Sequence, residues 1–148
     1  MGLGMSLVIA ATVPEPEPEI DHRRESGVVA RLQDVPDIGH FCPDVRTSTE
    51  IAYALVWPFP VYVVAGECDR AAFEMLCRKL DVRDLRASAE AGTDLSERVA
   101  FVAGEQEAAT FPCSFPPGHM HGTGSVTKAR FELWYSPEER TFLIEVRL

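Results

Sequence analysis

Two short segments of the sequence carry side chains that could bind a metal ion together. One reads His40-Phe-Cys42, and the other is His119-Met-His121, with Cys113 a few residues before it. In an extended segment, residues two apart point to the same side, so both members of a pair could reach one ion. Zinc prefers four nitrogen or sulfur ligands in a tetrahedron, which the two pairs could supply, and Cys113 could replace any one of them. Because the spacing matches no standard zinc motif, a zinc-binding or metal-dependent protein is our alternative hypothesis.

The cysteines allow other chemistry as well. Cys42 or Cys113 beside a histidine could form a thiolate–imidazolium pair, although neither lies in a recognisable nucleophile motif. The same two residues lie in loops that a disulfide could join. With Cys68 and Cys77 the chain has four cysteines, which allow three pairings, and no two of them are spaced Cys-x-x-Cys. The sequence therefore leaves disulfides, free thiols and metal-bound cysteines as alternatives.

Three aromatic side chains are candidates for contact with another protein. The segment Trp57-Pro-Phe59-Pro holds two rings in a turn made rigid by proline, which suits a protein contact. Trp134 falls on the polar face of a predicted strand. The competing interpretation is that these rings are partly buried beneath a loop, and we favour it.

No motif in the sequence names a reaction. Glycine-rich phosphate loops, His-Glu-x-x-His and Gly-x-Ser-x-Gly are all absent, and no pair of carboxylates is singled out as acid and base. We therefore lean against an enzyme and predict no catalytic residues and no cofactor other than the alternative zinc. The function that we predict is a non-enzymatic binding or protein-interaction domain whose ligand the sequence does not identify.

Composition narrows the class of partner. The chain has 148 residues, 46% of them hydrophobic and 25% charged, which is enough for one domain with a core that needs neither disulfide nor metal. Its net charge of −9 repels a phosphate backbone, so we expect no nucleic-acid partner, while a protein partner is compatible with it. The longest apolar runs are too short for an ordinary membrane span. The oligomeric state is not determined.

The N-terminal segment differs from the rest of the chain. Leu3 to Ala11 is apolar and ends in small residues, as the end of an export signal does, but no Lys or Arg precedes it. Val13 to Ile20 alternates Pro and Glu, which favours an extended linker. We expect residues 1–26 to be a flexible segment and 27–148 to be a single globular domain. We favour a cytoplasmic location slightly, and an exported or periplasmic one is compatible with the sequence.

The pattern of apolar residues predicts the elements that position these candidates. We expect strands at 28–32, 51–56 and 61–65, because each is rich in β-prone apolar residues. A helix at 69–80 follows from apolar spacings of three and four after the N-cap Asp69. Residues 84–104 fit a helix beginning near Asp94 and Glu97 or a strand at 99–103. Residues 105–127 show no periodicity, and because so long a loop is unusual in a compact domain, they are either a functional loop or contain an element that the pattern does not reveal.

The last twenty or so residues predict an amphipathic β-hairpin. Its strands, 129–135 and 141–148, alternate apolar residues with Arg130, Glu132, Glu145 and Arg147, which suit cross-strand ion pairs. We therefore predict an α+β fold with a small, mostly antiparallel sheet or partly open barrel, one or two helices and this C-terminal hairpin. The order strand-strand-strand-helix-strand-strand is compatible with an OB-like barrel.

Overall fold

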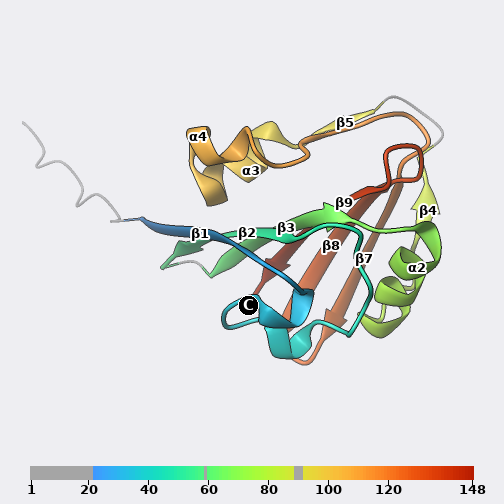
Figure 1. Cartoon of the computed structure of the whole chain (residues 1–148), viewed down its shortest axis with the longest axis horizontal. Coiled ribbons are helices and arrows are strands. Elements are labelled where there is room, and N and C mark those ends of the chain that lie inside the picture. The colour runs from blue at the N-terminus through green and yellow to red at the C-terminus, as the bar shows by residue number, and fades with distance from the viewer. Residues whose placement is uncertain (1–21, 59, 89–91) are drawn as a thin grey trace, which may run out of the picture.

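The computed structural model describes residues 22–58, 60–88 and 92–148, which form an α+β fold with a mostly antiparallel sheet (Figure 1). Within these residues a seven-stranded sheet has the order β1-β2-β3-β9-β8-β7-β4, and β5 pairs with β6 in a small second sheet. The strands are β1 (Arg23–Val29), β2 (Ile51–Trp57), β3 (Val61–Glu67), β4 (Arg86–Ala87), β5 (Thr93–Asp94), β6 (Ser114–Phe115), β7 (Met120–Val126), β8 (Ala129–Ser136) and β9 (Thr141–Arg147). The helices are α2 (Arg70–Lys79), α3 (Ser96–Ala103) and α4 (Glu105–Ala108), and two 3₁₀ turns are η1 (Leu32–Asp34) and η2 (Gly39–Phe41).

The predicted fold class is confirmed, and the OB-like barrel is wrong. In the part of the chain described, the sheet is open, with β1 at one edge and the short β4 at the other. The barrel does not close because, in the described residues, the edge strands β1 and β4 do not pair with each other. The first strand begins at Arg23, upstream of the expected start of the domain at residue 27, and Leu32 belongs to η1 instead of a strand.

The predicted hairpin and the predicted helix are both confirmed. Strands β8 and β9 pair directly, and their apolar residues form one continuous buried face. Helix α2 begins after Asp69, whose carboxylate accepts a hydrogen bond of 2.8 Å from the backbone N–H of Ala72. Cys77 lies on its buried side, as expected. None of the helices in the described residues is long and apolar enough to cross a membrane.

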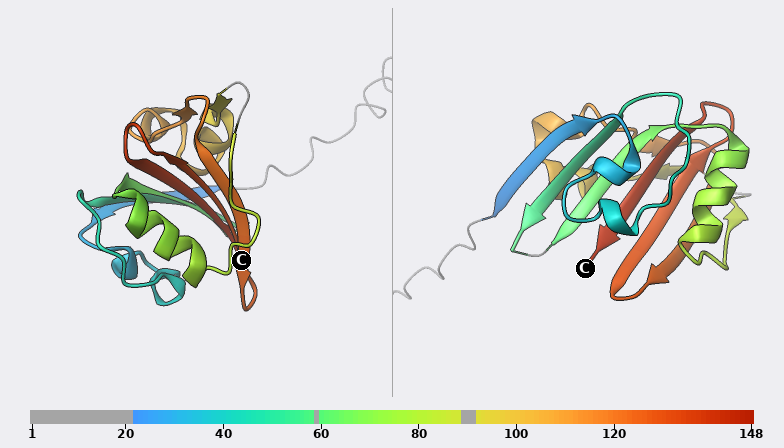
Figure 2. Two further views of the ribbon diagram at one scale, coloured as in Figure 1. Left: turned by 90° about the vertical axis from the view of Figure 1, so that its right-hand side faces the viewer. Right: turned by 60° about the horizontal axis from the view of Figure 1, so that its bottom comes forward.

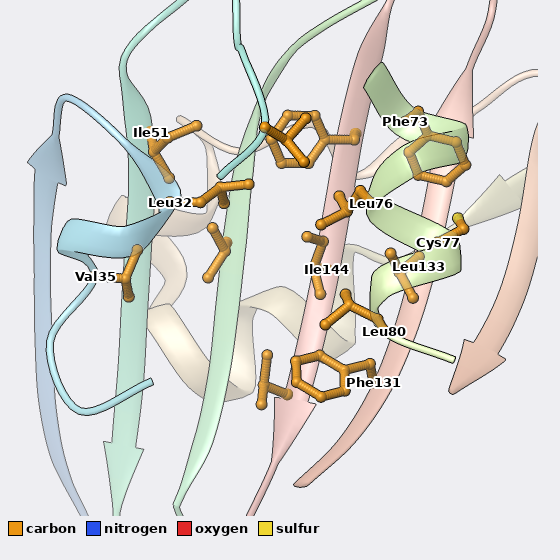
Figure 3. Packing of buried hydrophobic residues seen from close by; sticks show 14 of the residues in the cluster. Leu32, Val35, Ile51, Phe73, Leu76, Cys77, Leu80, Phe131, Leu133 and Ile144 are labelled. Atoms are coloured by element: carbon orange, nitrogen blue, oxygen red, sulfur yellow. The ribbon is translucent and has the colours of Figure 1, made fainter. Parts of the chain in front are cut away.

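The first face of the sheet is covered over most of its strands by α2 and by the turns η1 and η2. Helix α2 packs over the hairpin, where the rings of Phe73 and Tyr135 stack with centroids 4.5 Å apart. The turns η1 and η2 cover the strands on the other side, where Leu32 meets Ile51 (Figure 3). These layers enclose the larger of two hydrophobic clusters.

The second face is covered over only part of its width. Helix α3 packs against β1, β2 and β3, while α2 lies on the opposite side of the sheet (Figure 2). Beneath α3 a smaller cluster includes Ala54, Val63 and Val99. The segment 99–103 is therefore helical and not a strand. Asp94 lies just before α3, and its carboxylate accepts a hydrogen bond of 2.9 Å from the backbone N–H of Ser96.

The segment 105–127, which shows no periodicity in the sequence, contains a full strand of the sheet. Strand β7 reads Met-His-Gly-Thr-Gly-Ser-Val and lacks the apolar alternation that identifies a strand. Its glycines explain this, because a Cβ on Gly124 would lie 2.3 Å from the carbonyl oxygen of Leu80, and one on Gly122 would lie 2.5 Å from a methyl of Val82. The chain leaving α2 therefore lies directly on the backbone of β7, where other strands would carry apolar side chains.

This close approach predicts the effect of adding one methyl group. Gly124→Ala should lower the free energy of unfolding by roughly 1–3 kcal/mol, because the segment after α2 must move away from the sheet. The control is Ser125→Ala, an exposed position on the same strand, which should change it by less than about 0.5 kcal/mol. Urea unfolding of the two variants gives the comparison, and equal stabilities would contradict the packing described here.

Candidate functional site

The part of the second face that α3 does not cover carries polar side chains from three neighbouring strands. We define the open face as the side chains of β7, β8 and β9 on the α3 side of the sheet. They form three cross-strand rows: Ser125–Arg130–Arg147, Thr123–Glu132–Glu145 and His121–Trp134–Leu143. The first row is cationic, the second is anionic and the third is aromatic. This part of the sheet therefore presents a cationic, an anionic and an aromatic row next to one another.

Three hollows lie along the open face and share residues with one another. Their volumes are about 660, 450 and 680 Å³, and each falls in the size range of small-molecule sites. The first and third share Glu132, the second and third share Arg98, and the first and second share Glu145 and Arg147. We refer to the three together as the open-face groove.

Like charges face each other across the hairpin, so the expected cross-strand ion pairs are wrong. In the observed register Glu132 lies opposite Glu145, and Arg130 lies opposite Arg147. Directly opposed like charges destabilise a sheet. The sequence could not show this because the register depends on the turn between the strands, and a shift along one strand exchanges the partners.

Arg98 of helix α3 compensates the two glutamates. Its Nη2 atom donates to Glu132 Oε1 at 2.7 Å and to Glu145 Oε2 at 3.0 Å, and its Nε donates to the same Glu145 oxygen at 3.1 Å. Arg147 donates from Nε to the other oxygen of Glu145 at 2.7 Å. We call Arg98, Glu132 and Glu145 the Arg98 clamp, because they join the helix to both strands of the hairpin.

The clamp is partly shielded from water, which strengthens its hydrogen bonds. The side chain of Glu145 is 5% exposed and that of Glu132 is 27% exposed. Burial alone would raise the pKa of Glu132, but hydrogen bonds from Arg98 and His121 outweigh it and hold that pKa below its ordinary value. Glu132 is therefore ionised at neutral pH, and its stabilising contribution is lost only as the pH falls through this lowered pKa.

Trp134 lies within the site and is not a free surface ring. It is 3% exposed, because the ring of His121 stacks on it with centroids 5.4 Å apart and the Arg98 guanidinium lies 4.9 Å from its centre. His121 is held in turn by Glu132, with Nε2 and Oε2 2.7 Å apart. The favoured interpretation of burial holds for Trp134, although polar side chains cover it instead of a loop.

Of the other two aromatic candidates, Trp57 ends β2, where it is half-buried and packs against the hydrophobic cluster of the first face. It lines none of the three hollows of the open-face groove. Phe59 lies outside the described residues.

The predicted zinc ligands are divided between the two faces of the sheet. His119 and His121 line the same hollow, but His40 and Cys42 lie in and beside η2, which covers the opposite face. Among the described residues no three His, Cys, Asp or Glu side chains converge as a metal site would require. The structure thus brings together the two histidines and leaves the other pair apart.

The buried histidine, His119, already has neighbours for both ring nitrogens. It is 3% exposed, with Nδ1 2.9 Å from the carbonyl oxygen of Pro116 and Nε2 3.4 Å from Thr93 Oγ1. Because a carbonyl only accepts, the Nδ1 atom carries a proton and Nε2 can accept from the threonine. These contacts fix the ring at the end of the groove.

The four cysteines are free thiols with unfavourable conditions for reaction. Cys42 packs against the hydrophobic cluster of the first face and Cys113 against that of the second, so the disulfide that the sequence allows between them does not form. Burial raises the pKa of Cys42 to about 11 and that of Cys68 and Cys77 to about 12. Burial, with a smaller effect of Asp94, also raises the pKa of Cys113. None of the four is activated as a thiolate nucleophile.

Comparison with known protein families, with curated proteins and with solved structures finds no match for this chain. The site is therefore assigned from its own geometry. Sequence reasoning found His119 and His121 from their spacing but missed Arg98, which looks like an ordinary charge on the exposed side of a helix. Only the paired glutamates of the hairpin, which need a cation, could have indicated it.

The Arg98 clamp predicts an unequal effect of two arginine substitutions. Arg98→Met leaves both opposed glutamates with one cationic partner fewer, so the free energy of unfolding should fall by roughly 1–3 kcal/mol. Arg83→Met is the matched control, because Arg83 pairs with Asp81 in a bridge whose side chains are 86% and 54% exposed. It should change stability by less than about 1 kcal/mol.

A second variant distinguishes the loss of charge compensation in Arg98→Met from the loss of packing. Adding Glu132→Gln and Glu145→Gln to Arg98→Met removes the uncompensated charges, so the triple variant should recover part of the lost stability. Urea unfolding near pH 7 measures all of them. If Arg98→Met is no less stable than Arg83→Met, or if the triple variant is less stable than Arg98→Met, the clamp does not act as described.

Proposed function

We propose that this chain is a non-enzymatic binding domain that holds a small polar ligand in the open-face groove. The observation that carries the proposal is the half-covered sheet, in which α3 packs on β1–β3 and leaves the polar rows of β7–β9 beneath three connected hollows. A polar surface at the bottom of a concavity of this size is typical of a small-molecule site.

The groove is prearranged, which supports binding. Its floor consists of adjacent strands of the sheet, and the Arg98 clamp orients Glu132 and Glu145 before any ligand arrives. Side chains already fixed by hydrogen bonds lose little conformational entropy when they bind, so more of the contact energy contributes to affinity.

Binding is better supported than nucleophilic catalysis. The thiols have raised pKa values, and those of Cys42 and Cys113 belong to no part of the groove. Hydrogen bonds from Arg98 and His121 lower the pKa of Glu132, which stabilises its carboxylate and weakens it as a base, and Glu145 is hydrogen-bonded to Arg98 and Arg147. Ligand binding needs only these fixed charges and hydrogen-bond donors, whereas nucleophilic or acid–base catalysis needs a group that forms a bond or transfers a proton.

The test is a search for ligands that bind at this surface and nowhere else. Isotope-labelled protein is mixed with a panel of anionic, cationic and neutral small molecules, and backbone amide shifts are followed by NMR. We expect at least one class to give saturable shifts at Thr123, Glu132 and Glu145, with no comparable shifts on α2. Ser125→Trp should abolish them, because a large ring at this exposed position fills one of the hollows.

The matched control is Ser48→Trp, which adds the same ring at an exposed serine that lines none of the three hollows. It should leave the shifts and the affinity unchanged. If no class of ligand shifts the groove residues, or if Ser125→Trp and Ser48→Trp bind equally well, the groove is not a binding site.

A further inference from the structure

The cationic row of the open face contains an arginine whose charge is not compensated. Arg130 lies directly opposite Arg147 in the register of β8 and β9. Directly opposed side chains on paired strands have Cβ atoms only about 5 Å apart, so the two positive charges repel. Arg147 is bonded to Glu145 at 2.7 Å, but within the described part of the chain Arg130 forms no ion pair.

The protein compensates the charge repulsion of the two opposed pairs on this face to different degrees. The pair Glu132–Glu145 is bridged by Arg98, so its repulsion is removed within the protein. For the pair Arg130–Arg147 the protein supplies only the carboxylate of Glu145, and that carboxylate is shared with Arg98. An anion placed between the two arginines would compensate their repulsion, as Arg98 compensates that of the two glutamates.

The carboxylates around this hollow have other hydrogen-bond partners, and none of them forms an ion pair with Arg130 in the described part of the chain. Asp81 pairs with Arg83 at 3.1 Å. Asp84 accepts two hydrogen bonds of 2.7 Å from the backbone N–H and the hydroxyl of Thr123, which hold its pKa below the ordinary value. Glu132 is held by Arg98 and His121. The lining as a whole carries four carboxylates and three guanidinium groups, so an anion would be held by the adjacent groups of Arg130 and Arg147 and not by the net charge of the hollow.

We propose that this end of the groove binds the anionic group of a small ligand, a phosphate or a carboxylate, through Arg130 and Arg147. The hollow of about 660 Å³ that contains both arginines also contains Ser125, whose hydroxyl lies in the same cross-strand row and can donate to the ligand. Guanidinium groups match both anions because their planar N–H donors form two parallel hydrogen bonds. The proposal rests on the binding function and specifies the chemical class of its ligand.

The experiment titrates inorganic phosphate and, separately, malonate into labelled full-length protein at constant ionic strength, with chloride as the replaced anion. We expect saturable amide shifts at Ser125, Arg130 and Arg147. Arg130→Gln should weaken the affinity about tenfold or more, as loss of a charged hydrogen bond does, and Arg130→Lys should weaken it less. Arg46→Gln removes an exposed arginine from a loop outside the groove and should leave the affinity unchanged.

The outcomes distinguish a phosphate ligand from a carboxylate ligand, and they distinguish failure of the anionic site from failure of the binding function. Binding of phosphate alone identifies a phosphate-bearing ligand, and binding of malonate alone identifies a carboxylate. If Arg130→Gln and Arg46→Gln have equal effects, the anion binds to net charge and the site is overturned. If neither anion shifts the groove residues but a cationic or neutral small molecule does, the anionic site alone is overturned. If no class of small molecule binds, both the anionic site and the binding function are overturned.

Discussion

The open half of the sheet depends on how two opposed glutamates are compensated. Glu132 and Glu145 lie side by side on β8 and β9, and both point to the side where α3 lies. Without a cation between them they would repel in a partly shielded environment. Arg98 supplies that cation from α3, so one guanidinium joins the helix to the C-terminal hairpin and fixes the edge beyond which the sheet is left uncovered.

The rest of the groove follows from this position of α3. The helix covers β1–β3 with its apolar side and places Arg98 against the hairpin. On this part of the sheet Trp134, Leu143 and Glu145 are buried, whereas the other side chains of the rows are exposed or half-buried: Thr123, Ser125, Arg130 and Arg147 are exposed, and His121 and Glu132 are half-buried. Trp134 is buried because Arg98 and His121 cover it, and His121 is placed there by Glu132. Arg147 is joined to the clamp through Glu145, whereas its neighbour Arg130 forms no ion pair within the described residues, and this difference is the basis of the proposed anion site.

Sequence reasoning recovered the parts of the fold whose pattern is local. Helix α2 and the apolar side of the hairpin follow from short-range spacing, and both are confirmed. Strand β7 was missed because Gly122 and Gly124 replace the apolar residues of an ordinary strand to let another segment pack on its backbone. The site was missed for a related reason, since Arg98 is 34 and 47 residues from the glutamates it holds and no local pattern connects them.

The most direct test of this account is the titration of the Glu132 side chain by carboxyl-carbon NMR in the wild type and in Arg98→Met. In the wild type the midpoint should lie below the ordinary glutamate value of about 4.3, because hydrogen bonds from Arg98 and His121 favour the ionised form. In the variant it should rise, because burial then acts against the charge with less compensation. A wild-type midpoint at or above the ordinary value, or one that does not change in Arg98→Met, would contradict the central role of the Arg98 clamp.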